Sequence, residues 1–136
     1  MRVVLDTNVL LAAFISRGLC HDLLEHCIRE HEVVLSEFLL GEFKRKLKGK
    51  FRVPEERVGR AVALLRNHVE IVEPEPLPEP ACRDPDDDWV LATAVMGACR
   101  CVVTGDKDLL TLDGYDGIRI LGPRTFWVFE RRIAEG

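Results

Sequence analysis

The sequence predicts one α/β domain with a mainly parallel β-sheet, and three observations lead to this fold class. Short apolar runs, rich in β-branched residues, occur at 3–5, 33–35 and 101–103 and are typical of strands buried on both faces. Segments with apolar residues at helical spacing separate these runs, which is the alternation of an α/β fold. Acids follow two of the runs, at Asp6 and Asp106, where the carboxyl ends of parallel strands commonly bind ligands.

Length and composition are those of a single globular domain over residues 1–136. Hydrophobic residues make up 47% of the chain and charged residues 31%. The net charge of −4 argues against a protein that binds nucleic acid over its whole surface, although a local basic patch remains compatible with it. The sequence shows no signal peptide and no apolar stretch of about 18 residues, so we expect a cytoplasmic protein without a membrane partner.

Cysteine and histidine residues form no recognisable motif. The five cysteines include no Cys-x-x-Cys pair, and we expect them to be reduced structural thiols. His21, His26 and His31 are five residues apart, which turns each about 140° around a helix from the one before. They are therefore not expected to share a face or to form a zinc site.

Capping signals place the helices between the strands. Asn8, Ser36 and Asp84 are N-cap candidates, and Pro54 and Pro123 suit the first turn of a helix. The expected strands lie at 3–5, 33–35, 69–72, 101–103 and 118–121. The expected helices cover about 9–15, 19–28, 36–48, 54–69, 84–98 and 123–133, with one helical turn near 109–110.

The segment 73–83 separates the two halves of this pattern. It contains Pro74, Pro76, Pro78 and Pro80, so we expect an extended, polyproline-like chain. At about 3.1 Å per residue it reaches roughly 30 Å, enough to cross several strands. We interpret it as a crossover within one domain rather than as a boundary between two.

Two glutamates in the helix that follows Ser36 have different expected positions. Glu42 lies beside the apolar stripe formed by Leu39 and Phe43, so its carboxylate is directed toward the protein. Glu37 shares the opposite face with lysines, so we expect a solvent-exposed acid that the helix dipole favours in the first turn. Glu42 is therefore the candidate site residue.

A run of acids marks the start of the helix over 84–98. Asp84 is expected to act only as the N-cap. Asp88 precedes Leu91 by three residues and Ala92 by four, so it lies in line with the inward stripe and is our choice for the acid that faces the core. Because the acids are consecutive, the choice between Asp88 and Asp87 stays open by one position.

Asp6, Glu42, Asp88 and Asp106 can meet in one crevice if the strands that end at Asp6 and Asp106 are neighbours. Four unpaired carboxylates would repel one another strongly, and a hard divalent cation relieves that repulsion. Mg²⁺ and Mn²⁺ prefer such oxygen ligands, and they can activate water and hold a phosphodiester for in-line attack. The alternative is that the four acids serve separately as caps and surface charges.

Four motifs, in order along nearly the whole chain, resemble those of the PIN-domain ribonucleases, and most closely the VapC-like toxins of prokaryotic toxin–antitoxin systems. These motifs are Leu5-Asp6-Thr7-Asn8-Val9-Leu10, Glu42, Asp88-x-x-Leu-Ala-x-Ala, and Thr104-Gly105-Asp106-x-Asp108-Leu109. The resemblance implies a three-layer sandwich with a five-stranded parallel sheet in the order 3-2-1-4-5. It also implies an endoribonuclease that uses Mg²⁺ or Mn²⁺ and leaves a 5′-phosphate.

The resemblance further assigns roles and partners. The acids Asp6, Glu42, Asp88 and Asp106 correspond to the catalytic, metal-binding set, while Asn8, Thr104 and Asp108 correspond to supporting positions. The implied partners are an RNA substrate, a small antitoxin protein and a second copy of the chain in a homodimer, with Trp127 as one candidate contact.

A basic stretch over 44–52 has two interpretations. It contains the candidate RNA-binding residues Lys44, Arg45, Lys48, Lys50 and Arg52. These cations are either a solvated helix C-terminus, which the helix dipole favours, or a patch that contacts RNA phosphates.

Two other functions were weighed against a nuclease. A receiver-type phosphoacceptor domain also uses acids and Mg²⁺, but it needs paired acids after the first strand, whereas Asp6 is followed by Thr7 and Asn8. A PIN-fold module that binds RNA or protein without cleaving is the other alternative, and retention of all four acids argues against it.

Overall fold

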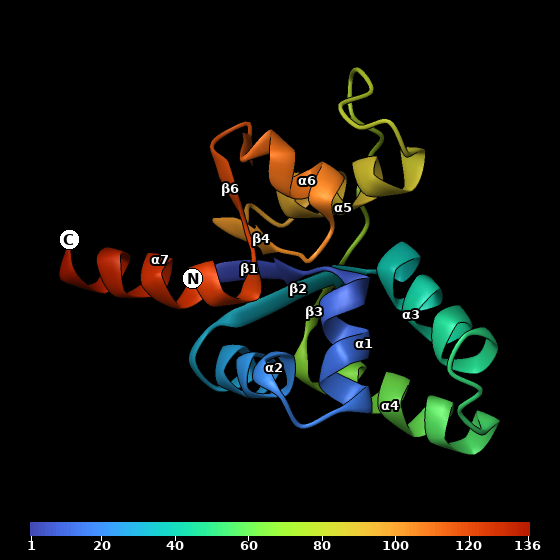
Figure 1. The fold of residues 1–136 in the computed structure, drawn as a ribbon. Helices are drawn as coiled ribbons and strands as arrows, with labels where there is room; N and C mark the ends of the chain where they lie inside the picture. Colours follow the sequence, from blue (N-terminus) through green and yellow to red (C-terminus); the bar gives the residue numbers. More distant parts are fainter.

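A single β-sheet runs through the middle of the molecule and determines where each strand ends (Figure 1). The computed structural model describes all of residues 1–136. Six strands pair in the order β3-β2-β1-β4-β6-β5. Their bounds are β1 Arg2–Leu5, β2 Glu32–Ser36, β3 Glu70–Val72, β4 Cys101–Val103, β5 Gly114–Tyr115 and β6 Ile118–Leu121. Strands β3, β2, β1, β4 and β6 are parallel to one another, whereas β5 is antiparallel to β6.

The predicted parallel sheet in the order 3-2-1-4-5 is confirmed with one addition. The strand predicted over 118–121 is β6, which takes the fifth place in that order. The additional edge strand β5 reaches β6 through Asp116 and Gly117, which have φ angles of 51° and 82°. Positive φ at both positions is the hallmark of the two-residue hairpin turn that Asp-Gly sequences favour. The sequence prediction overlooked this dipeptide.

Seven helices cover the two faces of the sheet. They are α1 Thr7–Ile15, α2 Leu19–Glu30, α3 Glu37–Gly49, α4 Glu55–His68, α5 Pro85–Met96, α6 Lys107–Leu112 and α7 Pro123–Glu135. In Figure 1, α1 to α4 lie below the central strands and α5 and α6 lie above them, which gives three layers. None of these helices has the length and apolar composition needed to cross a membrane.

Strand β1 is the central strand because residues 3–5 are apolar and it pairs with a strand on each side. Val3, Val4 and Leu5 have no exposed surface. Val3 pairs with Val33 of β2 on one side and with Cys101 of β4 on the other. The carboxyl ends of β1 and β4 are therefore side by side.

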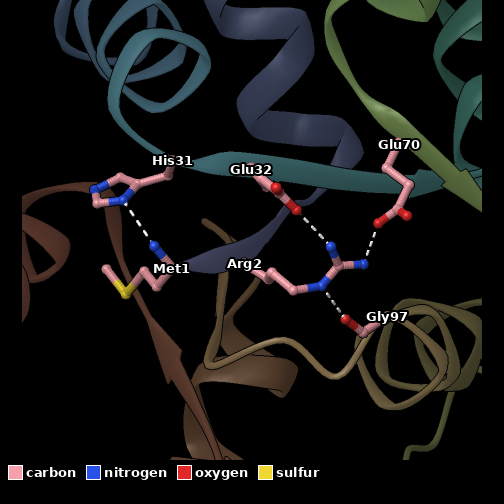
Figure 2. Close-up of polar contacts among 6 residues, drawn as sticks. All are labelled: Met1, Arg2, His31, Glu32, Glu70 and Gly97. Atoms are coloured by element: carbon pink, nitrogen blue, oxygen red, sulfur yellow. Dashed lines mark hydrogen bonds and ion pairs between the residues drawn. The ribbon is translucent and has the colours of Figure 1, made fainter.

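Arg2 links three parallel strands at their amino ends, opposite the carboxyl ends that carry Asp6 and Asp106 (Figure 2). Its guanidinium donates to the carboxylates of Glu32, at the start of β2, and Glu70, at the start of β3. Its Nε donates to the carbonyl oxygen of Gly97, the residue after α5, at 2.5 Å. The amino ends of the central strands are thereby tied together, and the carboxyl ends are left free for a site.

Candidate metal centre

Asp6 lies at the end of β1 with only 4% of its surface exposed. Its Oδ1 accepts a hydrogen bond from the Thr7 backbone N–H at 2.7 Å, so Asp6 is the N-cap of α1. The N-cap role predicted for Asn8 is therefore wrong, because the helix begins at Thr7, two residues earlier than the apolar pattern suggests. The Oδ2 of Asp6 accepts from the Thr104 hydroxyl at 2.8 Å and from Asn8 Nδ2 at 3.0 Å.

The loop after β4 is held against Asp6 by the same polar groups. The Gly105 N–H donates to Asn8 Oδ1 at 2.8 Å, and the Asp106 N–H donates to the Thr104 hydroxyl at 3.0 Å. Asp106 in turn caps α6, because its Oδ2 accepts from the Leu109 N–H at 3.1 Å. Asn8 and Thr104, predicted as supporting residues, thus join the strand ends that carry Asp6 and Asp106.

An acidic cavity opens above these strand ends, and we call it the carboxylate cavity. Its volume is about 370 Å³ and no hydrophobic residue lines it. The lining residues are Asp6, Asn8, Glu42, Arg45, Lys46, Asp84, Asp86, Asp87, Asp106 and Asp108. Three of the four predicted acids are therefore brought together, from the end of β1, the face of α3 and the loop after β4.

Asp88 does not line this cavity, which corrects the prediction that it faces the acid cluster. Its Oδ1 accepts hydrogen bonds from the backbone N–H groups of Ala81, at 3.1 Å, and Cys82, at 2.9 Å. It therefore holds the end of the proline-rich crossover against α5. The apolar stripe with which Asp88 is aligned faces the sheet, whereas the cavity lies beyond the first turn of the helix, where Asp87 projects into it.

Asp84 and Asp86 also line the cavity, which the sequence interpretation missed. Asp84 is the N-cap of α5, as predicted, with its Oδ1 accepting from the Asp86 N–H at 2.9 Å. Capping and cavity lining are compatible, because an N-cap carboxylate sits at the same end of the helix that faces the strand ends. Asp108 lines the rim and forms an ion pair with Arg83 at 3.0 Å.

The crowded acids shift one another's proton affinity. Burial raises the pKa of Asp87, and the nearby charges of Asp106, Asp84 and Asp6 raise it further, to about 7. Burial also raises the pKa of Asp6, and the charge of Glu42 adds to that effect. A cluster of carboxylates that resists ionisation by itself is a donor set suited to a hard divalent cation, so the residues present fit Mg²⁺ or Mn²⁺.

The basic residues of α3 divide into two groups. Arg45 and Lys46 line the carboxylate cavity. Lys46 was absent from the candidate RNA-binding set, although its position four residues after Glu42 places it on the same helix face. Away from the cavity, Lys48 pairs with Glu55 at 3.1 Å, and the Lys50 ammonium lies 5.5 Å from the Phe51 ring.

The remaining basic residues are exposed, and so is Glu37. Lys44 lies on the outer face of α3, and Arg52 follows the helix with a positive φ of 52°. Glu37 forms a bidentate ion pair with Arg66 of α4, at 2.5 and 2.8 Å, on the solvent side as expected. The cavity thus receives its two cations from Arg45 and Lys46 in the second half of α3.

The chain is thus an α/β protein with a mainly parallel sheet and a cluster of carboxylates at the carboxyl ends of its central strands. The model of the PIN domain family matches residues 2–108 of the chain. The chain therefore belongs to the PIN-domain family.

Solved structures with the same fold include VapBC and VapC proteins. VapBC2 from Rickettsia felis, bound to a DNA fragment from its promoter, aligns with a TM-score of 0.64 at 13% identity over 90% of this chain and 98% of that chain. VapBC-1 from nontypeable Haemophilus influenzae aligns at 0.63 and 18% identity over 91% and 99%. Mycobacterium tuberculosis VapC20, a toxin that cleaves the sarcin-ricin loop, aligns at 0.59 and 16% identity over 86% and 98%. No curated protein sequence matches this chain significantly.

Proposed function

We propose that this protein is an endoribonuclease that depends on Mg²⁺ or Mn²⁺ and acts as the toxin of a toxin–antitoxin pair. The observation that carries the proposal is the carboxylate cavity, in which acids from four elements converge without a single apolar neighbour. Membership of the PIN-domain family supports a nuclease, and the likeness to VapC20 supports RNA as the substrate class.

Asp6, Glu42, Asp87 and Asp106 would hold the ion, with Asp84 close enough to take part. A divalent ion held there supplies activation of the attacking water and neutralisation of charge on the phosphodiester. The chain's own contribution is preorganisation. Three hydrogen bonds fix the Asp6 carboxylate, and the link from Asn8 to the Gly105 N–H fixes the Asp106 loop, so that little reorganisation is needed on binding.

Arg45 and Lys46 supply the positive charge that an RNA phosphate requires beside so many carboxylates. In this proposal they bind the phosphates that flank the scissile bond and orient the backbone across the cavity. Lys44, Lys48, Lys50 and Arg52 extend the basic surface along and beyond α3, where they would contact the RNA backbone farther from the cut.

The purified protein is expected to cleave structured RNA when Mg²⁺ or Mn²⁺ is supplied and to leave 5′-phosphate ends. Asp6→Asn should lower the rate by about 100-fold or more, because the buried central ligand loses its charge. Gel analysis of end-labelled RNA, with EDTA as the metal-free control, measures both. Equal cleavage by Asp6→Asn would exclude this site, and RNA binding without any cleavage would favour a non-catalytic PIN module.

An apolar surface on the helical side of the molecule supports the proposal of an antitoxin partner. An apolar cavity of about 440 Å³ lies between α1, α2 and α4, and Ile15 and Leu64 at its wall are 46% and 50% exposed. Two structural neighbours are VapBC proteins, so we propose that a small antitoxin places an apolar helix here.

Leu64→Glu is expected to weaken antitoxin binding by about tenfold or more, because it puts a charge into the apolar contact. Co-purification with the proposed antitoxin measures this, with Ala63→Glu, exposed on the same helix, as the control. Unchanged binding by Leu64→Glu would exclude this surface. We also propose a homodimer, which sedimentation of the purified protein tests.

A further inference from the structure

A second group of side chains of types that bind metal ions lies near the amino ends of the central strands, away from the carboxylate cavity. His26 lies within α2, His31 follows the end of α2, and Glu130 lies on α7. The Nε2 atoms of both imidazoles converge on one oxygen, Glu130 Oε2, at 2.6 Å for His26 and 2.5 Å for His31. Their ligand atoms all lie within 4.8 Å of one another.

This arrangement corrects the expectation that the histidines cannot meet. The helical rotation of about 140° applies only while both residues are in the helix. His31 is the C-cap of α2 with an extended backbone, so its ring is free of the helical spacing and turns back toward His26. The two rings lie 5.6 Å apart.

We propose that His26, His31 and Glu130 bind a transition metal ion, best Zn²⁺, with water as the fourth ligand. Two imidazole nitrogens and one carboxylate oxygen are a ligand set that Zn²⁺ uses and that Mg²⁺ does not prefer. Ligand atoms of a tetrahedral zinc ion with bonds of about 2.0–2.1 Å lie roughly 3.3 Å apart. Each N–O distance to Glu130 needs to open by less than about 1 Å to reach that spacing.

The surroundings hold the three ligands in place. The Trp127 ring packs on His26 with centroids 4.6 Å apart, and the Phe126 ring lies edge-on to His31 at 6.0 Å. The Nδ1 of His31 lies 3.2 Å from the Met1 amino nitrogen, a contact that fixes the orientation of the ring (Figure 2). A metal ion on Nε2 leaves the ring proton on Nδ1, and the uncharged Met1 amine can accept a hydrogen bond from it, as the outer partners of metal-binding histidines commonly do.

The three ligand side chains are largely shielded from solvent but remain accessible to an ion. They are 21% exposed for His26, 12% for His31 and 22% for Glu130. An ion bound there would join α7, near the end of the chain, to α2 and to the start of β2. We therefore assign the ion a structural role, in which it fixes the last helix to the rest of the fold.

Calorimetric titration of chelator-treated, full-length protein with Zn²⁺ tests this proposal. Excess Mg²⁺ is present throughout, so that the carboxylate cavity does not take up the zinc. We expect one zinc ion per chain and a dissociation constant that rises about 100-fold in His26→Gln and in His31→Gln, since glutamine keeps hydrogen-bonding capacity but is a poor zinc ligand. Zinc should also raise the unfolding midpoint of the wild type by a few degrees and leave that of the variants unchanged.

A matched control comes from another group of potential ligands on α2. His21, Asp22 and Glu25 also lie within ligand distance of one another, but two of the three are exposed. His21→Ala should bind zinc as the wild type does. Zinc binding that is lost in His21→Ala, or that persists in both glutamine variants, would overturn the proposal.

A measurement on the wild type alone covers the case in which the variants do not fold. Imidazole ¹⁵N resonances report on each ring nitrogen, and zinc should shift those of His26 and His31 but not those of His21 and His68. Absence of any shift at His26 and His31 would overturn the proposal. The outcome is independent of RNA cleavage, so failure of the nuclease proposal would leave it intact.

Discussion

Asp87→Asn is expected to lower metal-dependent RNA cleavage by about 100-fold or more, whereas Asp88→Asn should retain activity within a few-fold of the wild type. Asp87 projects into the carboxylate cavity beside Asp106, so its charge contributes to holding the ion. Asp88 instead accepts two backbone hydrogen bonds from Ala81 and Cys82. An asparagine at 88 presents an oxygen to the same two donors, which makes it a matched control for the neighbouring substitution.

Initial rates of RNA cleavage over a range of Mg²⁺ concentrations separate the two residues. A loss that excess Mg²⁺ partly restores in Asp87→Asn indicates weaker ion binding. The reverse pattern, with activity lost only in Asp88→Asn, would show that the first turn of α5 reorients when the ion binds, and the assignment of Asp87 would be withdrawn.

Acids placed by strand ends were located correctly from the sequence, because a strand end is defined by the last buried residue. Leu5 and Val103 are fully buried, and the chain leaves the sheet directly after them. Asp6 and Asp106 therefore had to lie at the same edge once β1 and β4 were neighbours. The position of Glu42 followed from the apolar stripe of α3, which faces the protein along its whole length.

The third acid was harder to predict from the sequence. A helical wheel shows which residues face the sheet, but it does not show which ones project beyond the end of the helix. Asp88 satisfies the first criterion and Asp87 the second. His31 was misjudged for a related reason, since the pattern treated it as helical although α2 ends at Glu30. In both cases the error arose at a helix terminus, where side-chain directions depend on capping and on neighbouring chain segments.

Asp87→Asn is also expected to stabilise the metal-free protein at pH 8. The folded-state pKa of Asp87, about 7, lies above its ordinary value of 3.8. A carboxyl group with a raised folded-state pKa contributes stability that is present below pH 4 and is lost as the pH rises through about 7. At pH 8 the folded wild type therefore holds a carboxylate among like charges, and asparagine removes that repulsion.

The gain in the free energy of unfolding is expected to be about 1–2 kcal/mol. A full conversion of the pKa shift at 1.36 kcal/mol per unit would give more, but Asp87 is only partly buried and solvent screens its interactions. Urea unfolding in EDTA at pH 4 and pH 8 measures the difference, which should be near zero at the lower pH. Asp116→Asn in the β5–β6 turn is the control, because it removes the same charge at the opposite edge of the sheet.

Added Mg²⁺ should reverse the order of the two proteins at pH 8. The ion stabilises whichever folded protein binds it, by an amount that grows with its concentration relative to the dissociation constant. The wild type keeps the full set of carboxylates and should gain more than Asp87→Asn. If Mg²⁺ stabilises both proteins equally, Asp87 does not bind the ion, and the repulsion in the cavity has another function. If the order reverses, the same repulsion that weakens the metal-free fold is what gives the cavity its affinity for a cation.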